Sequence, residues 1–402
     1  MGNKKVIIIH PDRQHSLQTA KALQDAGYLH KYITAVYLKE HSLSSLFSSI
    51  APSGIKRKFL KHKVEGLDDD KVILVCELRM LILSIISLFL PTSVTFFIRK
   101  KLLHTFNKKC AKICHEQDFD ILFSFDTLSG DYYKTLKERG VKLVLDMSAP
   151  CYKAMYDSYL KDVNKHLEQS FVLKHFLQGP KAKMCLENCE KELRTYDYFV
   201  VASTYTKDTL LINGINEGQI IIVPYGVMQP KNLEKRPNGN FTCTYVGNVS
   251  QQKGCHYIFR IAKEYSNITF NLIGNFDNSY IEIPSNCILH GYLGFDDIRK
   301  ILTSSDLFLF LSLSDGFGFA AAEAMAYGVP VVCSQNSGIR DVVKDCGWII
   351  PSDDTDALRN ILCWSLEHRN ELTKKGTESQ QSLTNFTWEK YRNTLISFFD
   401  TL

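Results

Sequence analysis

A polar stretch that contains two glycines decides the fold, and it reads Ser312-Leu313-Ser314-Asp315-Gly316-Phe317-Gly318-Phe319-Ala320. It follows the apolar run 306–311 and precedes a helical pattern that ends near Gly328. A strand, a glycine turn and a helix in this order are typical of a parallel sheet covered by helices. Gly316 and Gly318 allow a tight turn and a close approach of the backbone to a ligand. The first amides of such a helix favour a phosphate, so the stretch also predicts an anion site.

The same alternation of short apolar runs and helical patterns extends over the whole chain. In the first half the expected strands are residues 6–10, 33–38, 72–75, 120–125, 142–147 and 197–202. In the second half they are residues 241–246, 268–273, 287–290, 306–311 and 329–334. Between the two halves, prolines and polar residues at 224–240 are typical of a linker. The pattern predicts an α/β protein with two Rossmann-like, doubly wound domains that face a central cleft, where ligands bind.

Length and composition agree with a folded protein of two domains. The chain has 402 residues, of which 45% are hydrophobic and 23% charged. Its N-terminus lacks the apolar stretch of a signal peptide, so we expect a cytoplasmic protein whose 12 cysteines are reduced thiols. Cys110 with Cys114, and Cys185 with Cys189, each lie on one helix face. Structural zinc sites usually carry cysteines of such spacing in loops and knuckles and not in helices, so we expect no metal.

A basic and apolar region lies in the first half. Residues 51–110 contain twelve Lys or Arg against five Asp or Glu, an excess of seven positive charges. Within it, residues 80–98 are mostly apolar and nearly long enough to span a membrane, but Pro91 interrupts them. We expect a pair of buried helices, or a patch that dips into the lipid interface. The basic stretch is either a solvated face or a surface for peripheral association with an anionic membrane. Nucleic acid is disfavoured, because no nucleic-acid-binding motif accompanies the charge.

A longer pattern around the opening stretch identifies a family. Residues 312–332 follow Ser-x-x-Asp-Gly-Phe-Gly-x-x-x-x-Glu-Ala-Met-Ala-x-Gly-x-Pro-Val-Val. This pattern resembles the donor-site signature of retaining glycosyltransferases with the GT-B fold, family 4 (glycosyl transferases group 1). The resemblance implies that Asp315 contacts the donor sugar and Glu323 the nucleotide ribose. Asp315 is one methylene shorter than the usual Glu, which puts the choice of donor in doubt. The expected donor-binding positions in this segment are Ser312, Gly316, Phe317, Gly318, Phe319 and Ala320.

A second loop, residues 247–254, resembles the family's Gly-Arg-x-x-x-x-Lys-Gly loop, whose two cations hold the donor diphosphate. Lys253 matches the family, whereas Asn248 stands at the position of the arginine. Cleavage of a sugar–phosphate bond leaves negative charge on the departing diphosphate, and this charge must be stabilised. We therefore expect Lys253 to be catalytic together with Asp315 and Glu323, and Gly247 and Asn248 to lie at the donor.

The first domain offers fewer signals. Arg13 and His15 follow the first strand, where the family usually has a glycine-rich loop that faces the acceptor, and we expect both on the acceptor side. Ser148 stands where the family often has a histidine after strand 142–147, so no clear base is left. The family's mechanism tolerates this, because the leaving phosphate is thought to accept the proton on the same face of the sugar.

The resemblance implies a metal-independent hexosyl or related transferase that needs no cofactor. It would move a sugar from a UDP- or GDP-linked donor to a glycan or lipid-linked acceptor, in cell-surface polysaccharide or glycolipid synthesis at the inner face of the plasma membrane. The expected domains are an acceptor domain, 1–228, completed by a C-terminal helix, 387–402, and a nucleotide-sugar domain, 241–386. Residues 229–240 would link them.

Other classes of protein stay open. Asp68-Asp69-Asp70 fits the Asp-x-Asp motif of GT-A transferases, but it precedes a strand, and metal ligation there needs carboxylates at the carboxyl end. A sugar-nucleotide epimerase can share the GT-B fold and would lack an acceptor site. A non-catalytic donor-binding or partner subunit is suggested by the departures at Asn248, Asp315 and Ser148.

Overall fold

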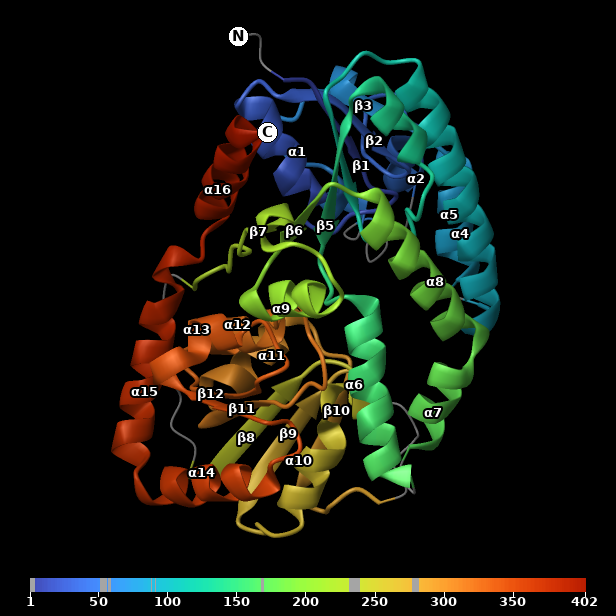
Figure 1. Ribbon diagram of the computed structural model, residues 1–402. Coiled ribbons are helices and arrows are strands. Elements are labelled where there is room, and N and C mark those ends of the chain that lie inside the picture. Colours follow the sequence, from blue (N-terminus) through green and yellow to red (C-terminus); the bar gives the residue numbers. More distant parts are fainter. Residues whose placement is uncertain are drawn as a thin grey trace.

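Two parallel sheets form the cores of two domains in the computed structural model of the chain (Figure 1). The structure describes residues 4–50, 56, 59–87, 89–90, 92–167, 170–230, 239–276 and 282–402. Within this part of the chain, both sheets carry helices on both faces, and the predicted α/β fold with two Rossmann-like domains is confirmed.

The first sheet has seven strands in the order β3-β2-β1-β4-β5-β6-β7. Its strands are β1 Val6–Ile9, β2 Leu29–Thr34, β3 Val72–Leu74, β4 Ile121–Phe125, β5 Lys142–Met147, β6 Tyr198–Val201 and β7 Ile220–Ile222. Its helices are α1 Ser16–Asp25, α2 Leu43–Ile50, α4 Glu77–Ile86, α5 Thr92–His115, α6 Tyr152–Lys165, α7 Phe171–Gln178, α8 Pro180–Thr195 and α9 Thr204–Ile212. Strands β1 and β4 are buried along their whole length, because helices cover both faces of a parallel sheet.

The second sheet has six strands in the order β10-β9-β8-β11-β12-β13. Its strands are β8 Phe241–Val246, β9 Ile268–Ile273, β10 Cys287–Gly291, β11 Leu307–Phe310, β12 Val331–Ser334 and β13 Trp348–Ile350. Its helices are α10 Cys255–Ala262, α11 Phe295–Thr303, α12 Phe319–Ala326, α13 Arg340–Val343, α14 Thr355–Glu367 and α15 Arg369–Ser382.

The last helix, α16 Trp388–Thr401, returns to the first domain (Figure 1). It begins at Thr387, whose side chain accepts a hydrogen bond from the amide of Lys390 at 3.1 Å. Tyr391 is fully buried against α1, and its hydroxyl lies 2.8 Å from the hydroxyl of Thr19. Residues 231–238 of the expected linker lie outside the described residues. The boundaries of the two domains therefore stay predictions.

Three expectations about strands need correction. Strand β2 is Leu29–Thr34 and not residues 33–38, because Gly27, at φ +77°, turns the chain directly after α1. Residues 35–38 follow the strand as buried loop, so their apolar character reflects burial alone. The edge strands β7 and β13, of three residues each, were not predicted.

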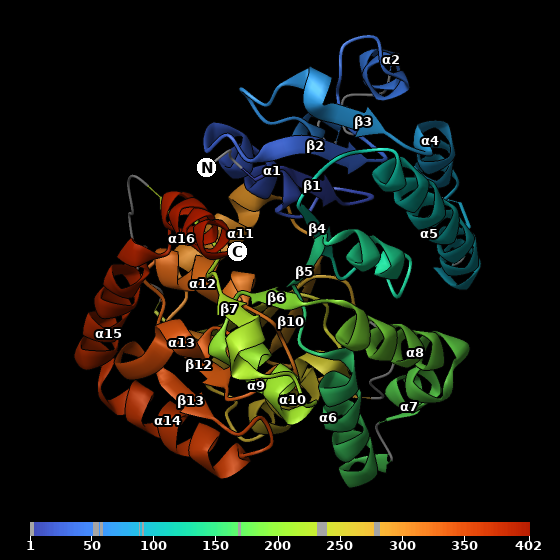
Figure 2. The same ribbon diagram turned by 45° about the horizontal axis from the view of Figure 1, so that its top comes forward.

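The expected pair of helices at residues 80–98 is present as α4 and α5, but the expectation that both are buried was wrong. Helices α4 and α5 lie side by side along the outside of the first sheet (Figure 2), so only one side of each contacts the core. Met80 and Leu83 are buried, whereas the side chains of Leu78 and Phe97 are more than half exposed. In the described part of the chain, no helix is both long and apolar enough to cross a membrane. All 12 cysteines are free thiols, and Cys110, Cys114 and Cys189 are buried.

Candidate functional site

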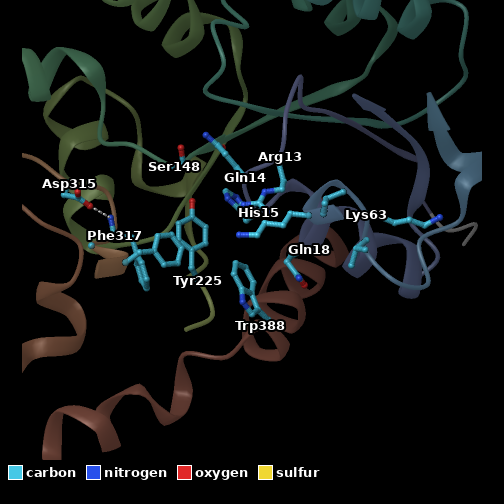
Figure 3. Close-up of a pocket in the computed structure, with 15 residues that line it drawn as sticks. Arg13, Gln14, His15, Gln18, Lys63, Ser148, Tyr225, Asp315, Phe317 and Trp388 are labelled. Carbon is cyan, nitrogen blue, oxygen red and sulfur yellow. Dashed lines mark hydrogen bonds between the residues drawn. The ribbon is translucent and has the colours of Figure 1, made fainter. Parts of the chain in front are cut away.

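A cleft of about 560 Å³ lies between the two domains (Figure 3). It is lined from the first domain by the loop after β1, by residues 61–64 and by Ser148 after β5, and from the second domain by the loop after β11. Tyr225, on the segment that leaves the first domain, and Trp388, at the start of α16, complete it. Loops at the carboxyl ends of strands from both sheets therefore meet there, as expected for a ligand site in parallel α/β domains. Of the predicted residues, the cleft brings together Arg13, His15, Ser148, Asp315, Phe317, Gly318 and Phe319.

Lys253 and Asp315 form an ion pair on the second-domain side. The Nζ atom of Lys253, between β8 and α10, lies 2.6 Å from Oδ2 of Asp315, between β11 and α12. The other carboxylate oxygen accepts the amide of Phe317 at 3.2 Å. Gly254, at φ +72°, lets the two loops pack, because a Cβ atom there would lie 2.0 Å from the carbonyl oxygen of Leu311. Asp315 thus lines the cleft, and Lys253, which a separate motif predicted, is paired with it but is not among the residues that line the cleft.

Gly316 and Gly318 have different roles in the same loop. A Cβ atom on Gly316 would lie 2.3 Å from the carbonyl oxygen of Ser148, so only glycine fits between the domains. The carbonyl oxygen of Gly316 accepts a hydrogen bond from Ser203 Oγ at 2.7 Å, which also crosses the interface. Gly318, at φ +88°, is the N-cap of α12 and supplies no side chain to its first amides. These amides are left for another acceptor, as an anion site requires.

Some predicted donor residues lie outside the cleft lining. Ser312 is fully buried, and its hydroxyl donates to the carbonyl oxygen of Ser314 at 3.2 Å, so it supports the loop. Asn248 is exposed and lines a neighbouring hollow of about 550 Å³ together with Gln252 and Phe176 of α7. Gly247, at φ +147°, lies against Gly274, where a Cβ atom would be 2.0 Å from the carbonyl oxygen of Gly247. The absence of a side chain at Gly274 thus permits close contact between the backbones of the two glycines.

Glu323 and Ala320 follow in α12. Glu323 is exposed, and among the described residues its carboxylate has no hydrogen-bond partner. Partial desolvation by the surrounding protein raises the pKa of this carboxyl. A carboxylate that is partly desolvated but unpaired is suited to accept a hydrogen bond from a ligand hydroxyl. Ala320, half-buried, packs against the core.

His15 is held by a carboxylate on the first-domain side. Its Nε2 atom lies 2.8 Å from Oδ2 of Asp146 in β5, and both side chains are almost fully buried. The imidazole packs against Tyr225, with ring centroids 4.5 Å apart (Figure 3). His15 is therefore a fixed, paired histidine. Sequence analysis did not single out Asp146, although an acid at the carboxyl end of an apolar strand was a signal for it.

A second, half-buried carboxylate is hydrogen-bonded to Ser148. The Ser148 hydroxyl donates to Asp126, at 2.9 Å and 3.1 Å from its two oxygens, and the amide of Ala149 donates to it at 3.1 Å. Burial raises the pKa of Asp126 to about 6, and the hydrogen bonds offset only part of that rise. Asp126 immediately follows β4 and was also missed by sequence analysis.

Four aromatic side chains also line the cleft between the two domains. Tyr225 stacks on Phe319, with an interplanar angle of 9° and centroids 5.3 Å apart. Phe317 meets Tyr225 edge to face, and Trp388 lies at a centroid distance of 6.3 Å. Aromatic faces of this kind suit the apolar face of a ring-shaped ligand. Sequence analysis placed Tyr225 only in the linker-like stretch 224–240.

The second domain resembles parts of known proteins. Residues 240–368 match the family described as Glycosyl transferases group 1. O-antigen chain mannosyltransferase B of Escherichia coli is 30% identical over 115 residues, which are 28% of this chain and 29% of that protein. MMP alpha-(1->4)-mannosyltransferase of Mycolicibacterium hassiacum is 23% identical over 222 residues, 51% of this chain and 54% of that protein. The chain thus spans between about a third and about half of the length of the curated relatives it matches.

Solved structures resemble the whole chain. HepE of Anabaena in complex with UDP has a TM-score of 0.60 at 13% identity and covers 99% of this chain and 100% of its own. The lipopolysaccharide outer core galactosyltransferase WaaB has a TM-score of 0.59 at 14% identity, with 98% and 99% covered. These likenesses establish the fold, and the architecture is the GT-B fold with two Rossmann-like domains.

Proposed function

We propose that this chain is a glycosyltransferase that moves a sugar from a nucleotide-sugar donor to a hydroxyl of a glycan or lipid-linked acceptor, with retention of the anomeric configuration. The observation that carries the proposal is the ion pair of Lys253 and Asp315, 2.6 Å apart, of which Asp315 lines the cleft. The match of residues 240–368 to Glycosyl transferases group 1 supports the same assignment.

The donor diphosphate would bind at Lys253 and at the uncapped N-terminus of α12. Lys253 supplies a full positive charge, and the amides that follow Gly318 supply hydrogen-bond donors and a favourable dipole. Together they can stabilise the charge that develops on the departing diphosphate, so we propose transfer without a metal in the reaction. Asp315 then lies where a donor sugar would be, and its pairing with Lys253 orients both groups.

The acceptor would approach from the first-domain wall. Arg13 and His15 line the cleft opposite Phe317, and Asp146 fixes the orientation of the imidazole. A histidine held this way can position an acceptor hydroxyl toward the donor carbon. The leaving phosphate would take the proton of that hydroxyl, since no side chain at Ser148 can serve as a strong base.

An exposed apolar face favours a lipid-linked acceptor and contact with a membrane. A hollow of about 590 Å³ between α4, α5, α7 and α8 is lined by Leu83, Phe96 and Phe176 among others, with Arg99 and Lys181 at its edge. Arg99 lies 3.6 Å from Asp12, directly before the cleft residue Arg13. Apolar surface rimmed by cations suits lipid chains that carry an anionic head group. Synthesis of a cell-surface polysaccharide or glycolipid is the process that this acceptor implies.

The test starts with a thermal-shift screen of UDP- and GDP-linked sugars, because a ligand that binds the native state raises the melting temperature. The best donor then enters two assays, donor hydrolysis and transfer to lipid-linked acceptors, with product configuration measured by NMR. Transfer with retention in the presence of a metal chelator is the expected result. Inversion would overturn the proposed stereochemistry, interconversion of the donor sugar without acceptor would indicate an epimerase, and donor binding without either reaction would indicate a binding subunit.

A further inference from the structure

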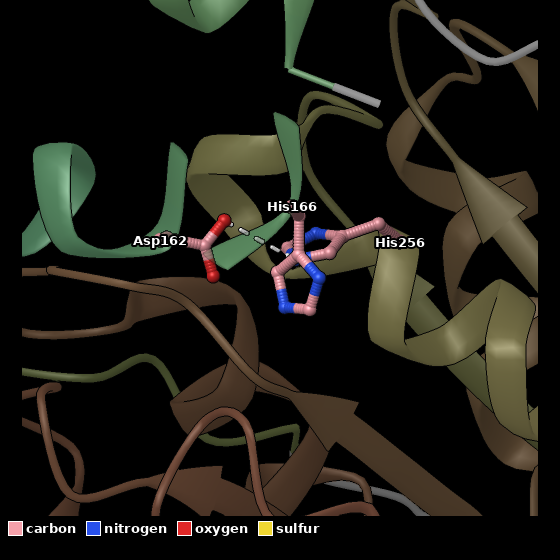
Figure 4. A group of neighbouring side chains, drawn as sticks. All are labelled: Asp162, His166 and His256. Carbon is pink, nitrogen blue, oxygen red and sulfur yellow. Dashed lines mark ion pairs between the residues drawn. The ribbon is translucent and has the colours of Figure 1, made fainter. Parts of the chain in front are cut away.

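Three potential metal ligands meet away from the cleft residues, where α6 packs against α10 (Figure 4). Asp162 lies in the last turn of α6, His166 directly follows that helix, and His256 lies in the first turn of α10. One ligand atom from each residue lies within 4.8 Å of the other two. Helix α6 follows a strand of the first sheet and α10 a strand of the second, so the cluster joins the two domains.

His256 lacks one of the hydrogen bonds that a buried imidazole needs. Its side chain is 1% exposed, its Nε2 atom is paired only with Asp162, and within the described part of the chain its Nδ1 atom has no hydrogen-bond partner. Leaving such a group unsatisfied costs about 1–3 kcal/mol. Its Nε2 atom lies 3.3 Å from Oδ2 of Asp162. Two tetrahedral zinc ligands, each about 2.1 Å from the ion, are themselves about 3.4 Å apart, so the pair is spaced as two ligands of one ion.

The partners of Asp162 resemble the outer shell of a metal site. Gln251 Nε2 donates to Oδ2 at 2.8 Å, and the hydroxyl of Tyr257 donates to Oδ1. The same hydroxyl lies 3.1 Å from Nε2 of His166. These contacts fix the carboxylate and the half-buried imidazole, as second-shell groups do at known metal sites. Arg260, 3.3 Å from Nδ1 of His166, adds an opposing positive charge at the solvent side.

We propose that Asp162, His166 and His256 bind one divalent transition-metal ion of the zinc type, with water as the fourth ligand. Two imidazoles and one carboxylate are a ligand set that Zn²⁺ accepts, whereas Mg²⁺ and Ca²⁺ require mainly oxygen. The ion links α6 to α10. Because Ser158 of α6 also donates to the carbonyl oxygen of Leu313 at 2.7 Å, the link stiffens the support of the loop that carries Asp315. The site is structural and independent of the proposed transfer reaction.

The experiment titrates the chelator-treated full-length protein with Zn²⁺ in competition with a chromophoric chelator, and then with Co²⁺. One ion per chain and the strong visible absorption of four-coordinate Co²⁺ are expected. Asp162→Asn and His256→Ala should each weaken Zn²⁺ binding by more than about 100-fold, because loss of a second-shell group alone costs about 10–100-fold. His115→Ala, which removes an exposed histidine of α5, is the matched control and should bind as the wild type does.

Circular dichroism shows whether each variant folds. If the two buried variants do not fold, His166→Ala decides, because its side chain is only half-buried. Hydrogen exchange reports the link itself, and Zn²⁺ should slow exchange in α6 and α10 of the wild type but not of His166→Ala. Absence of stoichiometric binding, unchanged affinity in His166→Ala, or equal exchange with and without Zn²⁺ would each overturn the proposal.

Discussion

The two walls of the cleft are built in different ways. The second-domain wall comes from short continuous loops, and its charged groups, Lys253 and Asp315, are paired and remain 28% and 20% exposed. The first-domain wall joins segments far apart in the chain, and of its two acids Asp146 is almost fully buried and Asp126 is half-buried. A wall of the first kind can receive a charged ligand at little desolvation cost. A wall of the second kind fixes side chains by burial, which makes its geometry rigid and its electrostatics sensitive to pH.

The largest effect, a loss of turnover, is expected from a substitution in the second-domain wall. Lys253→Ala removes the cation that we propose stabilises the leaving diphosphate, and loss of one such group costs about 10²–10³-fold in turnover. Steady-state transfer assays measure it. Lys263→Ala, which removes an exposed lysine paired with Glu282 in the same domain, should stay within about twofold of the wild type. Near-normal turnover of Lys253→Ala would leave this wall without a role in catalysis.

The next prediction concerns the buried acids of the first-domain wall. Because the native pKa of Asp126 is raised from 3.8 to about 6, the native state binds this proton more tightly than the unfolded chain. The stability that the protonated carboxyl of Asp126 contributes is therefore complete below pH 3.8 and is lost as the pH rises through about 6. The loss by pH 7 corresponds to at most about 3 kcal/mol. Asp126→Asn should remove this part of the pH dependence while its amide oxygen still accepts hydrogen bonds from Ser148 and Ala149.

Chemical denaturation at about pH 4.5 and about pH 7.5 tests this prediction. The wild type should lose more stability between the two conditions than Asp126→Asn does. Glu138→Gln, which changes an exposed carboxylate, should keep the wild-type dependence. Parallel curves for Asp126→Asn and the wild type would mean that burial of Asp126 is not what distinguishes the first wall.

The difference between the walls also explains what could be predicted from the sequence. Six-residue strands such as β5 and β8 were found because they are almost entirely buried runs. The edge strands β7 and β13 have three residues each and were missed, although the equally short edge strand β3 was found. The loop with Asp315 was found because its residues are contiguous. Asp126 and Asp146 come together only when β4 and β5 pair in the sheet, which no local motif records.

Contacts between loops and contacts between domains were likewise not predicted from local sequence. Lys253 and Asp315 were each predicted from a motif, but their ion pair depends on how two loops pack at Gly254. The cluster of Asp162 and His256 was missed because its ligands come from different domains. Local sequence thus predicts the second wall, and contacts between distant segments determine the first wall and the interface.

Gly316→Ala tests whether the two walls are locked together. A Cβ atom 2.3 Å from the carbonyl oxygen of Ser148 must push the domains apart or distort the loop, and such overpacking costs about 1–3 kcal/mol. A lower melting temperature and a wider cleft in small-angle scattering are expected. Gly294→Ala, where nothing lies within 4 Å of the added atom, is the control. Equal melting temperatures for the two variants would mean that the walls adjust independently.

The smallest effect is expected at Glu323, which belongs to the second-domain wall by sequence but does not line the cleft. If its carboxylate accepts a hydrogen bond from the ribose of the donor, Glu323→Ala should weaken donor binding about tenfold, the loss of one hydrogen bond to a charged group. Turnover at saturating donor should change little, because the contact is equal in the ground state and the transition state. Calorimetric titration with the donor measures the affinity, and Glu371→Ala, an exposed position on α15, is the control. Unchanged affinity in Glu323→Ala would mean that the donor contacts the ion pair and the loop between Asp315 and Phe319 but not Glu323.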